Sequence, residues 1–394
     1  MKAFNLVLKT SANQVLAAVH ALVFSIITTR ELSPDLFGDL RFVLSLLPVL
    51  MVASLPTYDN ILLRNSTKFI FTPLYKVTLL RVTGGVLASI SILLYLFIFD
   101  VGDNLWFFLI ITSVLLPFFE TFTGYRNFLI GSRLKKQSIN SYMIVKITSI
   151  GLFLLFYALT VYYELDKRLL LLFYFLSSII PTVIVMSTVM YKQWNKQRYS
   201  KIRSPQMNLS SAIVTSLAAG IMTLSFSLDK MLIHDVWGAE SLAFYAILIM
   251  FPLELAKLVD AVFPLFYRKV IVNNIQVGLN KLVLVGISFL VIGVIYSSFA
   301  YLLFPIVFGT FYTYDFTVVL VSFLLVISGV SEYYVIQKMY INSNYRLILS
   351  YALVSLFCTY GIMSAVLPLS SLIGVIIAVF FRQITQSLLF LRVC

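Results

Sequence analysis

Three ionisable side chains interrupt one long apolar run of this sequence. The stretch FPLELAKLVDAVF, residues 251–263, carries Glu254, Lys257 and Asp260, and the apolar run around it extends from about residue 242 to residue 266. At 100° per residue, the three side chains fall within an arc of about 120° on one helix face. An ammonium between two carboxylates can bind an anion, bind an exchangeable ion, or only neutralise its neighbours at a spacing of three.

Arg382, Glu120 and Lys146 also interrupt apolar runs. Arg382 lies in AVFFRQITQ, Glu120 in PFFETFTGYRN and Lys146 in YMIVKITSI. The guanidinium of Arg382 can bind two phosphate oxygens at once, so it is a second candidate for an anion contact. Its alternative role is to pair with Glu254 or Asp260. We expect Glu120 and Lys146 to form a structural pair, or to reach the aqueous surface with their charged ends.

Four further side chains complete the candidate set. Arg41 lies one turn into a predicted helix, where it could line a cavity. Asp229 and Lys230 are expected to pair and to fix a helix terminus beside a short loop. His20 is the histidine inside an apolar run, which makes it a candidate for proton coupling. We expect no cofactor, and the sequence leaves the coupling ion, proton or sodium, open.

The composition defines the solvent around these charges. Hydrophobic residues make up 60% of the chain and charged residues 11%, with a mean hydropathy of +0.98, whereas soluble domains carry about 25% charged residues. The chain is therefore predicted to be an integral membrane protein. A charged side chain at the centre of a membrane helix costs at least about 2.5 kcal/mol and normally faces a bundle interior or water. We thus expect the face with Glu254, Lys257 and Asp260 to line a wet cavity.

The apolar runs predict twelve membrane-spanning helices. At roughly 20 apolar residues per span, the 394 residues have room for about a dozen. Lipid offers the backbone no hydrogen-bond partner, and continuous apolar runs without two-residue alternation exclude a barrel. The predicted fold class is an all-α polytopic membrane protein with about twelve transmembrane helices in two pseudo-symmetric six-helix bundles. The predicted spans are 12–29, 40–57, 82–99, 105–123, 142–162, 169–190, 210–231, 241–263, 283–304, 317–336, 347–366 and 371–391.

Basic residues predict the orientation of these spans. Lys and Arg stay on the cytoplasmic side of bacterial membrane proteins, and every second loop of this chain is basic. The sequence therefore predicts a multi-pass protein of the bacterial plasma membrane with both termini in the cytoplasm. The net charge of +13 follows largely from this topology, so we do not interpret it as a nucleic-acid-binding surface.

The chain divides at a basic loop after the sixth span. The predicted domains are an N-terminal six-helix lobe (1–190), a basic cytoplasmic linker (191–209) and a C-terminal six-helix lobe (210–394). The stretches SPDLFGDLRF (33–42) and GAESLAFYAI (238–247) align across this linker with acidic, apolar and small residues in register. Each joins the first predicted helix of its half to the second, which indicates a duplication of the kind common in transporters.

Two segments resemble a known family. TTRELSPDLFGDLRFVLSL (28–46) and LSFSLDKMLIHDVWGAESLAFYAILIMFPLELAKLVDAVFPLFYRK (224–269) are similar to polysaccharide flippases of the Wzx (O-antigen) type. These belong to the multidrug, oligosaccharidyl-lipid and polysaccharide exporter superfamily. The resemblance covers about 65 residues, and the remainder matches in helix number and length. The positions that match the family pattern are Asp229, Lys230, Gly238, Glu240, Phe244, Tyr245 and Pro264.

The resemblance implies a substrate and a mechanism. The expected substrate is an oligosaccharide on undecaprenyl diphosphate, moved from the cytoplasmic to the outer leaflet by alternating access for surface polysaccharide synthesis. Lys257, Arg382 and Arg41 would then line the cavity and contact the diphosphate. Membrane lipids and other polysaccharide assembly proteins are the further partners that we expect.

Two other functions stay open at this point. A drug or cation exporter of the same superfamily would need an acidic cavity, and the three acids and three cations counted inside the spans cancel. A membrane glycosyltransferase or polymerase is disfavoured, because the predicted outer connections are only about ten residues long. The sequence also has no phosphate-binding Gly-rich loop, no clustered metal ligands and no nucleophile beside a base.

Overall fold

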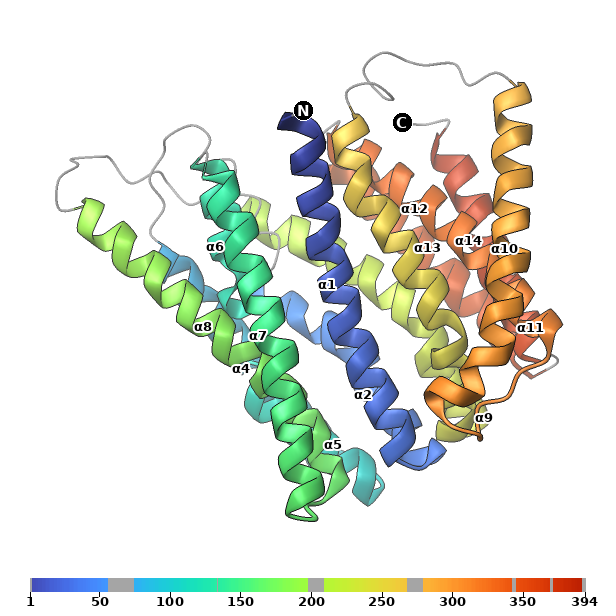
Figure 1. The fold of residues 1–394 in the computed structure, drawn as a ribbon, viewed down its shortest axis with the longest axis horizontal. Helices are drawn as coiled ribbons and strands as arrows, with labels where there is room; N and C mark the ends of the chain where they lie inside the picture. Colours follow the sequence, from blue (N-terminus) through green and yellow to red (C-terminus); the bar gives the residue numbers. More distant parts are fainter. Residues whose placement is uncertain are drawn as a thin grey trace. The chain divides into compact units, whose positions relative to one another are not determined.

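The computed structural model describes residues 2–55, 74–132, 134–197, 209–267, 279–341, 345–368 and 371–391, and these contain helices and no strand. Side chains are described for most of these residues, but not for 2–11, 14, 131, 135, 193–197, 209–212, 214–215, 257–267, 279–290, 333–341, 345–346 or 391. In chain order the elements are α1 (Lys2–Glu31), α2 (Pro34–Leu50), η1 (Met51–Ser54), α4 (Leu74–Ile98), α5 (Asp103–Leu115), η2 (Thr121–Gly124), α6 (Tyr125–Gly131), α7 (Lys135–Tyr162), η3 (Lys167–Leu169), α8 (Leu170–Gln197), α9 (Leu209–Tyr267), α10 (Leu279–Phe308), α11 (Phe316–Ser322), α12 (Leu324–Ile341), α13 (Tyr345–Val366) and α14 (Leu372–Leu391) (Figure 1).

The predicted fold class is confirmed. Each of the twelve predicted spans falls mainly on helical residues. The fourth span is interrupted between α5 and η2, the tenth is divided between α11 and α12, and residues 56–57 of the second lie outside the described residues. Eight stretches of the described chain are long and apolar enough to span a membrane. The helices form because an apolar solvent leaves the backbone only its own hydrogen bonds.

Helix α9 contains two of the predicted spans and reverses direction between them. Gly238 has φ +85°, which breaks the helix in the middle of its 59 residues. The hydroxyl of Tyr245 donates to Asp229 Oδ2 at 2.6 Å, although 16 residues of straight helix would separate them by about 24 Å. Gly238 therefore closes a helical hairpin, at the position where the sequence predicts a short loop.

Packing divides the chain into two compact units, which do not follow the sequential halves. Unit 1 contains Met1–Val15, Ser25–Arg41 and Leu228–Cys394, and unit 2 contains Leu16–Phe24 and Phe42–Ser227. The predicted lobes 1–190 and 210–394 stay a prediction. Most of the predicted linker, residues 198–208, lies outside the described residues.

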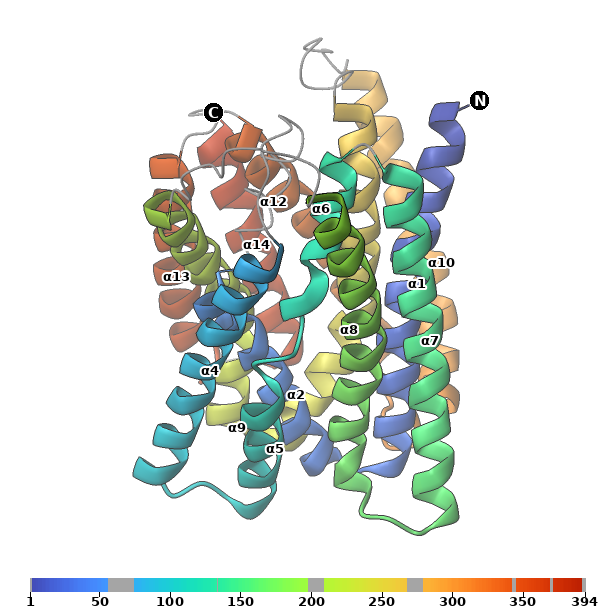
Figure 2. The ribbon, with the colours of Figure 1, turned by 90° about the vertical axis from the view of Figure 1, so that its left-hand side faces the viewer.

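Unit 2 is built on two pairs of neighbouring helices. Helix α7 packs along α8, and α4 packs against α5 and η1. Figure 2 shows the α4–α5 and α7–α8 connections at the same end of this unit, as the predicted topology requires. Gly84 permits the approach of α4 to η1, because a Cβ at this position would lie 2.1 Å from the Ala53 carbonyl oxygen.

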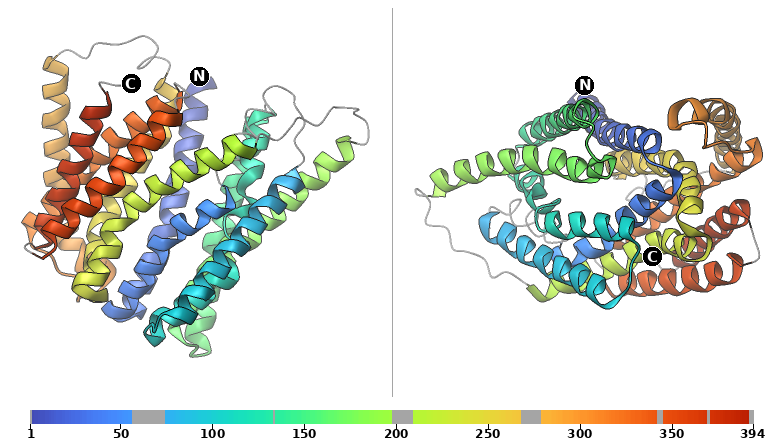
Figure 3. Two further views of the ribbon diagram at one scale, coloured as in Figure 1. Left: turned by 180° about the vertical axis from the view of Figure 1, so that it is seen from behind. Right: turned by 90° about the horizontal axis from the view of Figure 1, so that it is seen from below.

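Unit 1 gathers the C-terminal helices. Helix α14 packs against α11, α12 and α13, and α10 packs against α11, as the views from the front and from behind both show (Figures 1 and 3). The indole of Trp237, beside the α9 turn, donates to the Leu367 carbonyl at 3.1 Å. Arg30, at the end of α1, donates to the Val307 carbonyl at 2.9 Å. The helix ends that the sequence places on the outer side thus lie together in this unit.

Candidate functional site

The fourth predicted span is broken near its inner end. Helix α5 ends at Leu115, and the chain resumes as η2 at Thr121 and as α6 at Tyr125. Pro117 lies in the break and lacks the amide that a continuing helix would donate. At Glu120 the backbone is left-handed, with φ +52°, a conformation that costs roughly 1–2 kcal/mol outside glycine.

The backbone of Glu120 is held in place by hydrogen bonds. Its carbonyl oxygen accepts from Arg81 Nη2 at 3.0 Å, from Thr123 Oγ1 at 2.7 Å and from the Thr123 amide at 3.2 Å. Arg81 reaches it from α4 and is 2% exposed. The neighbouring Thr121 hydroxyl donates to the Pro117 carbonyl at 2.9 Å. These bonds replace the helical bonds that the break removes.

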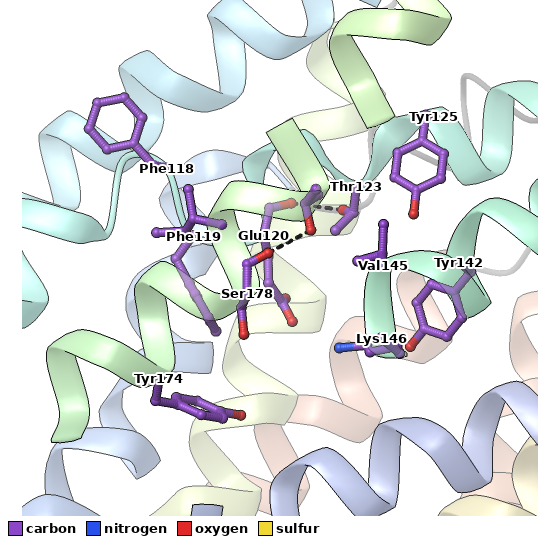
Figure 4. Close-up of a pocket in the computed structure, with 12 residues that line it drawn as sticks. Phe118, Phe119, Glu120, Thr123, Tyr125, Tyr142, Val145, Lys146, Tyr174 and Ser178 are labelled. Atoms are coloured by element: carbon purple, nitrogen blue, oxygen red, sulfur yellow. Dashed lines mark hydrogen bonds between the residues drawn. The ribbon is translucent and has the colours of Figure 1, made fainter. Parts of the chain in front are cut away.

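A polar and aromatic pocket opens beside this break. It encloses a cavity of about 80 Å³ within unit 2, between α7, α8 and the broken span (Figure 4). The lining residues are Phe118, Phe119, Glu120, Thr123, Tyr125, Tyr142, Val145, Lys146, Tyr174, Ser178, Ile179 and Thr182.

The charged side chains of the lining are Glu120 and Lys146, and they face each other across the cavity (Figure 4). In the described part of the chain, their charged ends form neither a hydrogen bond nor an ion pair with each other. The ammonium of Lys146 lies 5.6 Å from the centre of the Tyr142 ring, and the Arg126 guanidinium lies 3.9 Å from the same ring. Lys146 therefore lines the cavity with Glu120, and Arg126 and Arg81 lie behind the lining, on Tyr142 and on the Glu120 backbone carbonyl.

His20 lies next to this pocket. Its ring is 2% exposed and stacks on Tyr174 with centroids 5.1 Å apart. Phe24 stacks on the same tyrosine at 4.1 Å. In the described structure, His20 Nε2 has no hydrogen-bond partner. The ring is thus part of an aromatic stack behind the pocket, and its role in proton coupling stays a prediction.

Arg382 lies in a second polar cluster, within unit 1. It is 5% exposed, and its Nη2 lies 3.8 Å from Glu332 Oε2. Its Nη1 donates to Ser355 Oγ at 2.8 Å, and the Tyr351 hydroxyl donates to Glu332 Oε1 at 3.2 Å. Helices α12, α13 and α14 supply these groups. The ion-pair partner of Arg382 is therefore a carboxylate that the sequence analysis did not single out.

The remaining candidates near the predicted outer ends make contacts within unit 1. Arg41 donates to the Ser25 hydroxyl, and its guanidinium lies 4.8 Å from the centre of the Phe37 ring. Asp229 contacts Lys230 Nζ at 3.2 Å and accepts from Tyr245. The predicted pairing of Asp229 with Lys230 is present, and its location is between the two arms of the α9 hairpin.

The helix face with Glu254, Lys257 and Asp260 lies in the second half of α9. Glu254 is half-buried. Lys257 and Asp260 lie on the α9 backbone, but their side chains lie outside the described residues. The cavity that we predict for these three residues stays a prediction.

Sequence reasoning missed three of the groups that form these clusters. Glu332 interrupts the apolar run 317–336, so the rule that singled out Glu120 would also have found it. Arg81 and Arg126 were counted among the inner charges that set the topology. Their contacts with Glu120 and Tyr142 depend on the break in the fourth span, which no periodicity predicts.

Comparison with known proteins identifies the architecture. No protein-family model and no curated sequence matches the chain. Solved transporter structures match over 98% of it. An outward-facing multidrug resistance MATE transporter of the MOP superfamily is 14% identical with a TM-score of 0.58 over 93% of its length. A MATE structure in complex with MaD3S is 14% identical with a TM-score of 0.61 over 94% of its length.

A third match carries information about the pocket. It is a MOP superfamily transporter from Pyrococcus furiosus, 14% identical with a TM-score of 0.60, with 93% of its length covered. Its description states that the reverse polarity of its binding pocket suggests a different function. This chain has the MATE-type fold. At such low identity the likeness establishes the fold alone, so the pocket's own chemistry must distinguish between cargoes.

Proposed function

We propose that the chain is a membrane exporter that works by alternating access and carries undecaprenyl-diphosphate-linked oligosaccharide to the outer leaflet. The observation that carries this proposal is the surplus of positive charge around the unit 2 pocket. Lys146 lines the pocket together with Glu120, while Arg126 lies against the lining residue Tyr142 and Arg81 donates to the Glu120 backbone carbonyl. Hydroxyl groups and aromatic rings complete the lining, and both are suited to sugars.

The cargo poses a physical problem that such a pocket addresses. A sugar diphosphate cannot enter roughly 30 Å of hydrocarbon unaided, because burying its charges without partners costs far more than binding can return. A cation inside the protein replaces part of the lost hydration. Lipid tails need no such replacement and can remain in the bilayer.

A multidrug or cation exporter is the second candidate, and the MATE-type fold is equally consistent with it. Such an exporter would use Glu120 as the acceptor for a cationic drug. The neighbour from Pyrococcus furiosus supports pocket polarity as the relevant criterion, because its description connects reversed polarity with a different function. One acid and one base line this pocket, and the two guanidinium groups next to the lining favour an anionic cargo.

Translocation in liposomes would test the cargo. We expect the purified protein to move a fluorescent polyprenyl-diphosphate disaccharide between leaflets and not a cationic dye. Lys146→Gln should lower the rate by roughly 10- to 100-fold, since a hydrogen bond to a charged group contributes about 1.5–3 kcal/mol. Lys146→Arg should retain part of the translocation rate. Dye transport that depends on Glu120, without lipid transport, would favour the cation exporter.

Lys136 offers a matched control. It lies on the same helix, α7, but is exposed and does not line the pocket. Lys136→Gln should leave both transport activities unchanged. An equal loss in both variants would show that lysine substitution in α7 harms the protein generally, and would remove the support for an anion contact at Lys146.

Loss of the gene in cells tests the same proposal. Lipid-linked oligosaccharide should accumulate facing the cytoplasm, while surface polysaccharide disappears. Incomplete oligosaccharides would instead indicate a glycosyltransferase or polymerase. We also propose that the protein lies in the bacterial plasma membrane, alongside other polysaccharide assembly proteins. Reporter fusions near residues 102, 237 and 369 should then report the outer side, and fusions near 72, 200 and 275 the cytoplasm.

A further inference from the structure

Glu120 combines a fixed backbone with an unpaired side chain. Three hydrogen bonds hold its carbonyl oxygen, one of them from the buried Arg81. Its carboxylate, by contrast, makes no hydrogen bond or ion pair with the described residues. Left-handed backbone outside glycine persists only where the surroundings enforce it, and such positions concentrate at binding sites. The hydrogen bonds thus fix the backbone from which this exposed side chain extends, and the carboxylate takes no part in packing.

The size of the pocket limits what can lie between Glu120 and Lys146. A cavity of about 80 Å³ has room for roughly five to eight water-sized groups. A phosphate with the adjoining edge of one sugar ring has this size, whereas a whole oligosaccharide does not. The group held here must therefore be a short polar junction whose remainder extends out of the pocket.

We propose that Glu120 distinguishes glycosylated lipid diphosphates from the bare lipid diphosphate. In this arrangement Lys146 binds a phosphate, and Glu120 accepts hydrogen bonds from hydroxyl groups of the sugar attached to it. The inference rests on the proposed function and deepens it, because it assigns a specificity-determining residue to the same pocket.

The chemistry of the two ligands differs at this position. An ionised carboxylate only accepts hydrogen bonds, and sugar hydroxyls can donate them. A terminal phosphate has no donor and carries a charge of about −1.5 to −2 at pH 7, so a carboxylate repels it. Specificity of this kind needs both an attraction to the right ligand and a repulsion of the wrong one. Glu120 supplies both with one group.

Binding measurements on the purified protein test this proposal. The probes are a polyprenyl diphosphate and the same lipid carrying one hexose, compared by Kd in detergent at pH 7.5. We expect the wild-type protein to bind the glycosylated lipid about tenfold more tightly, as one charge-assisted hydrogen bond predicts. Glu120→Gln removes the repulsion but keeps an acceptor, so bare diphosphate should bind more tightly. Glu120→Ala also removes the acceptor, so the preference should fall to twofold or less.

Glu164 provides a close control. It also has a left-handed backbone, with φ +51°, but it is exposed and lies outside the pocket lining. Glu164→Gln should retain the wild-type preference. An unchanged preference in folded Glu120→Gln and Glu120→Ala would overturn the role of Glu120, even if the wild-type protein binds both lipids. Failure of the wild-type protein to bind either lipid, together with binding of a cationic dye, would instead overturn the proposed function.

Discussion

The cluster around Arg382 and the pocket around Lys146 both place charges inside a membrane protein, but they use them differently. In unit 1, Arg382 and Glu332 lie 3.8 Å apart with side chains 4% and 3% exposed, and Arg382 also donates to Ser355 while Glu332 accepts from Tyr351. In unit 2, Glu120 and Lys146 face each other across a cavity without pairing.

This difference separates charges that support the fold from charges that are available to a ligand. An ionised group in a membrane is expensive and must be compensated. Arg382 and Glu332 compensate each other, so little of their charge remains for a cargo. Glu120 and Lys146 depend on the water or ligand in the cavity. The distance to a partner, more than the presence of charge in a helix, thus distinguishes the paired charges of unit 1 from the charges that face a cavity in unit 2.

The largest effect should come from breaking the closed cluster. Arg382→Met leaves the Glu332 carboxylate buried without its cation, and removing one partner of a buried ion pair typically costs about 3–5 kcal/mol. Unfolding in detergent, followed by heat or denaturant, would measure this loss. The double variant Arg382→Met with Glu332→Gln should recover most of the stability, because neither charge then remains. A stable single variant would contradict the structural role of the pair.

A smaller loss of stability should follow from removing a hydrogen bond to the backbone of Glu120. Arg81→Leu removes one of the three hydrogen bonds to the Glu120 carbonyl, and a hydrogen bond from a charged donor contributes about 1.5–3 kcal/mol. The same unfolding experiment should show a decrease in this range. We also expect Arg81→Leu to weaken lipid binding, because the carboxylate would no longer be fixed in the pocket. If Arg81→Leu bound the lipid as tightly as the wild-type protein does, the hydrogen bond from Arg81 to the Glu120 carbonyl would not be needed for binding.

The exposed pair in the α7–α8 connection gives a reference for a weak interaction. Asp166 accepts from Arg168 Nε at 2.8 Å and from its amide at 2.9 Å, and the hydrogen bond from the Arg168 side chain lowers the pKa of Asp166 below its usual 3.8. A lowered pKa contributes stability above the unfolded-state pKa, which is lost as the pH falls through the folded-state value. Asp166→Asn should cost at most about 1 kcal/mol at pH 7, and the difference should shrink as the pH falls below 3.8 and vanish below the lowered pKa of Asp166.

The smallest effect on stability should come from the open pair. Glu120→Gln and Lys146→Gln remove no hydrogen bond or ion pair of the described structure, so each should change the free energy of unfolding by no more than about 0.5 kcal/mol. Both should nonetheless change ligand binding strongly. If either variant lost stability as Arg382→Met does, the distinction between closed and open charges would fail.

The sequence predicted the positions of the helices better than the side-chain contacts between them. Apolar runs located all twelve spans, because lipid imposes helix on any long apolar segment. Glu120 and Lys146 were recognised as charges in such runs, and the structure places them at one pocket. They form no ion pair with each other in the described structure, and the alternative expectation, that their charged ends reach an aqueous surface, stays a prediction. The partner of Arg382 was missed, since pairing across α12 and α14 follows from packing and not from spacing along one helix.

The hydrogen bond from Arg81 to the Glu120 carbonyl also affects how the chain inserts into the membrane. A buried arginine such as Arg81 costs about 2.5–3.5 kcal/mol in lipid when it has no partner, and a broken helix leaves backbone groups that lipid cannot satisfy. Alone, α4 and the segment from α5 to α6 would each be poorly soluble in the bilayer. The bond between Arg81 and the Glu120 carbonyl gives a partner to each and so lowers both penalties. We therefore expect the translocon to retain the third span until the fourth emerges, and to release the two into lipid as one hairpin.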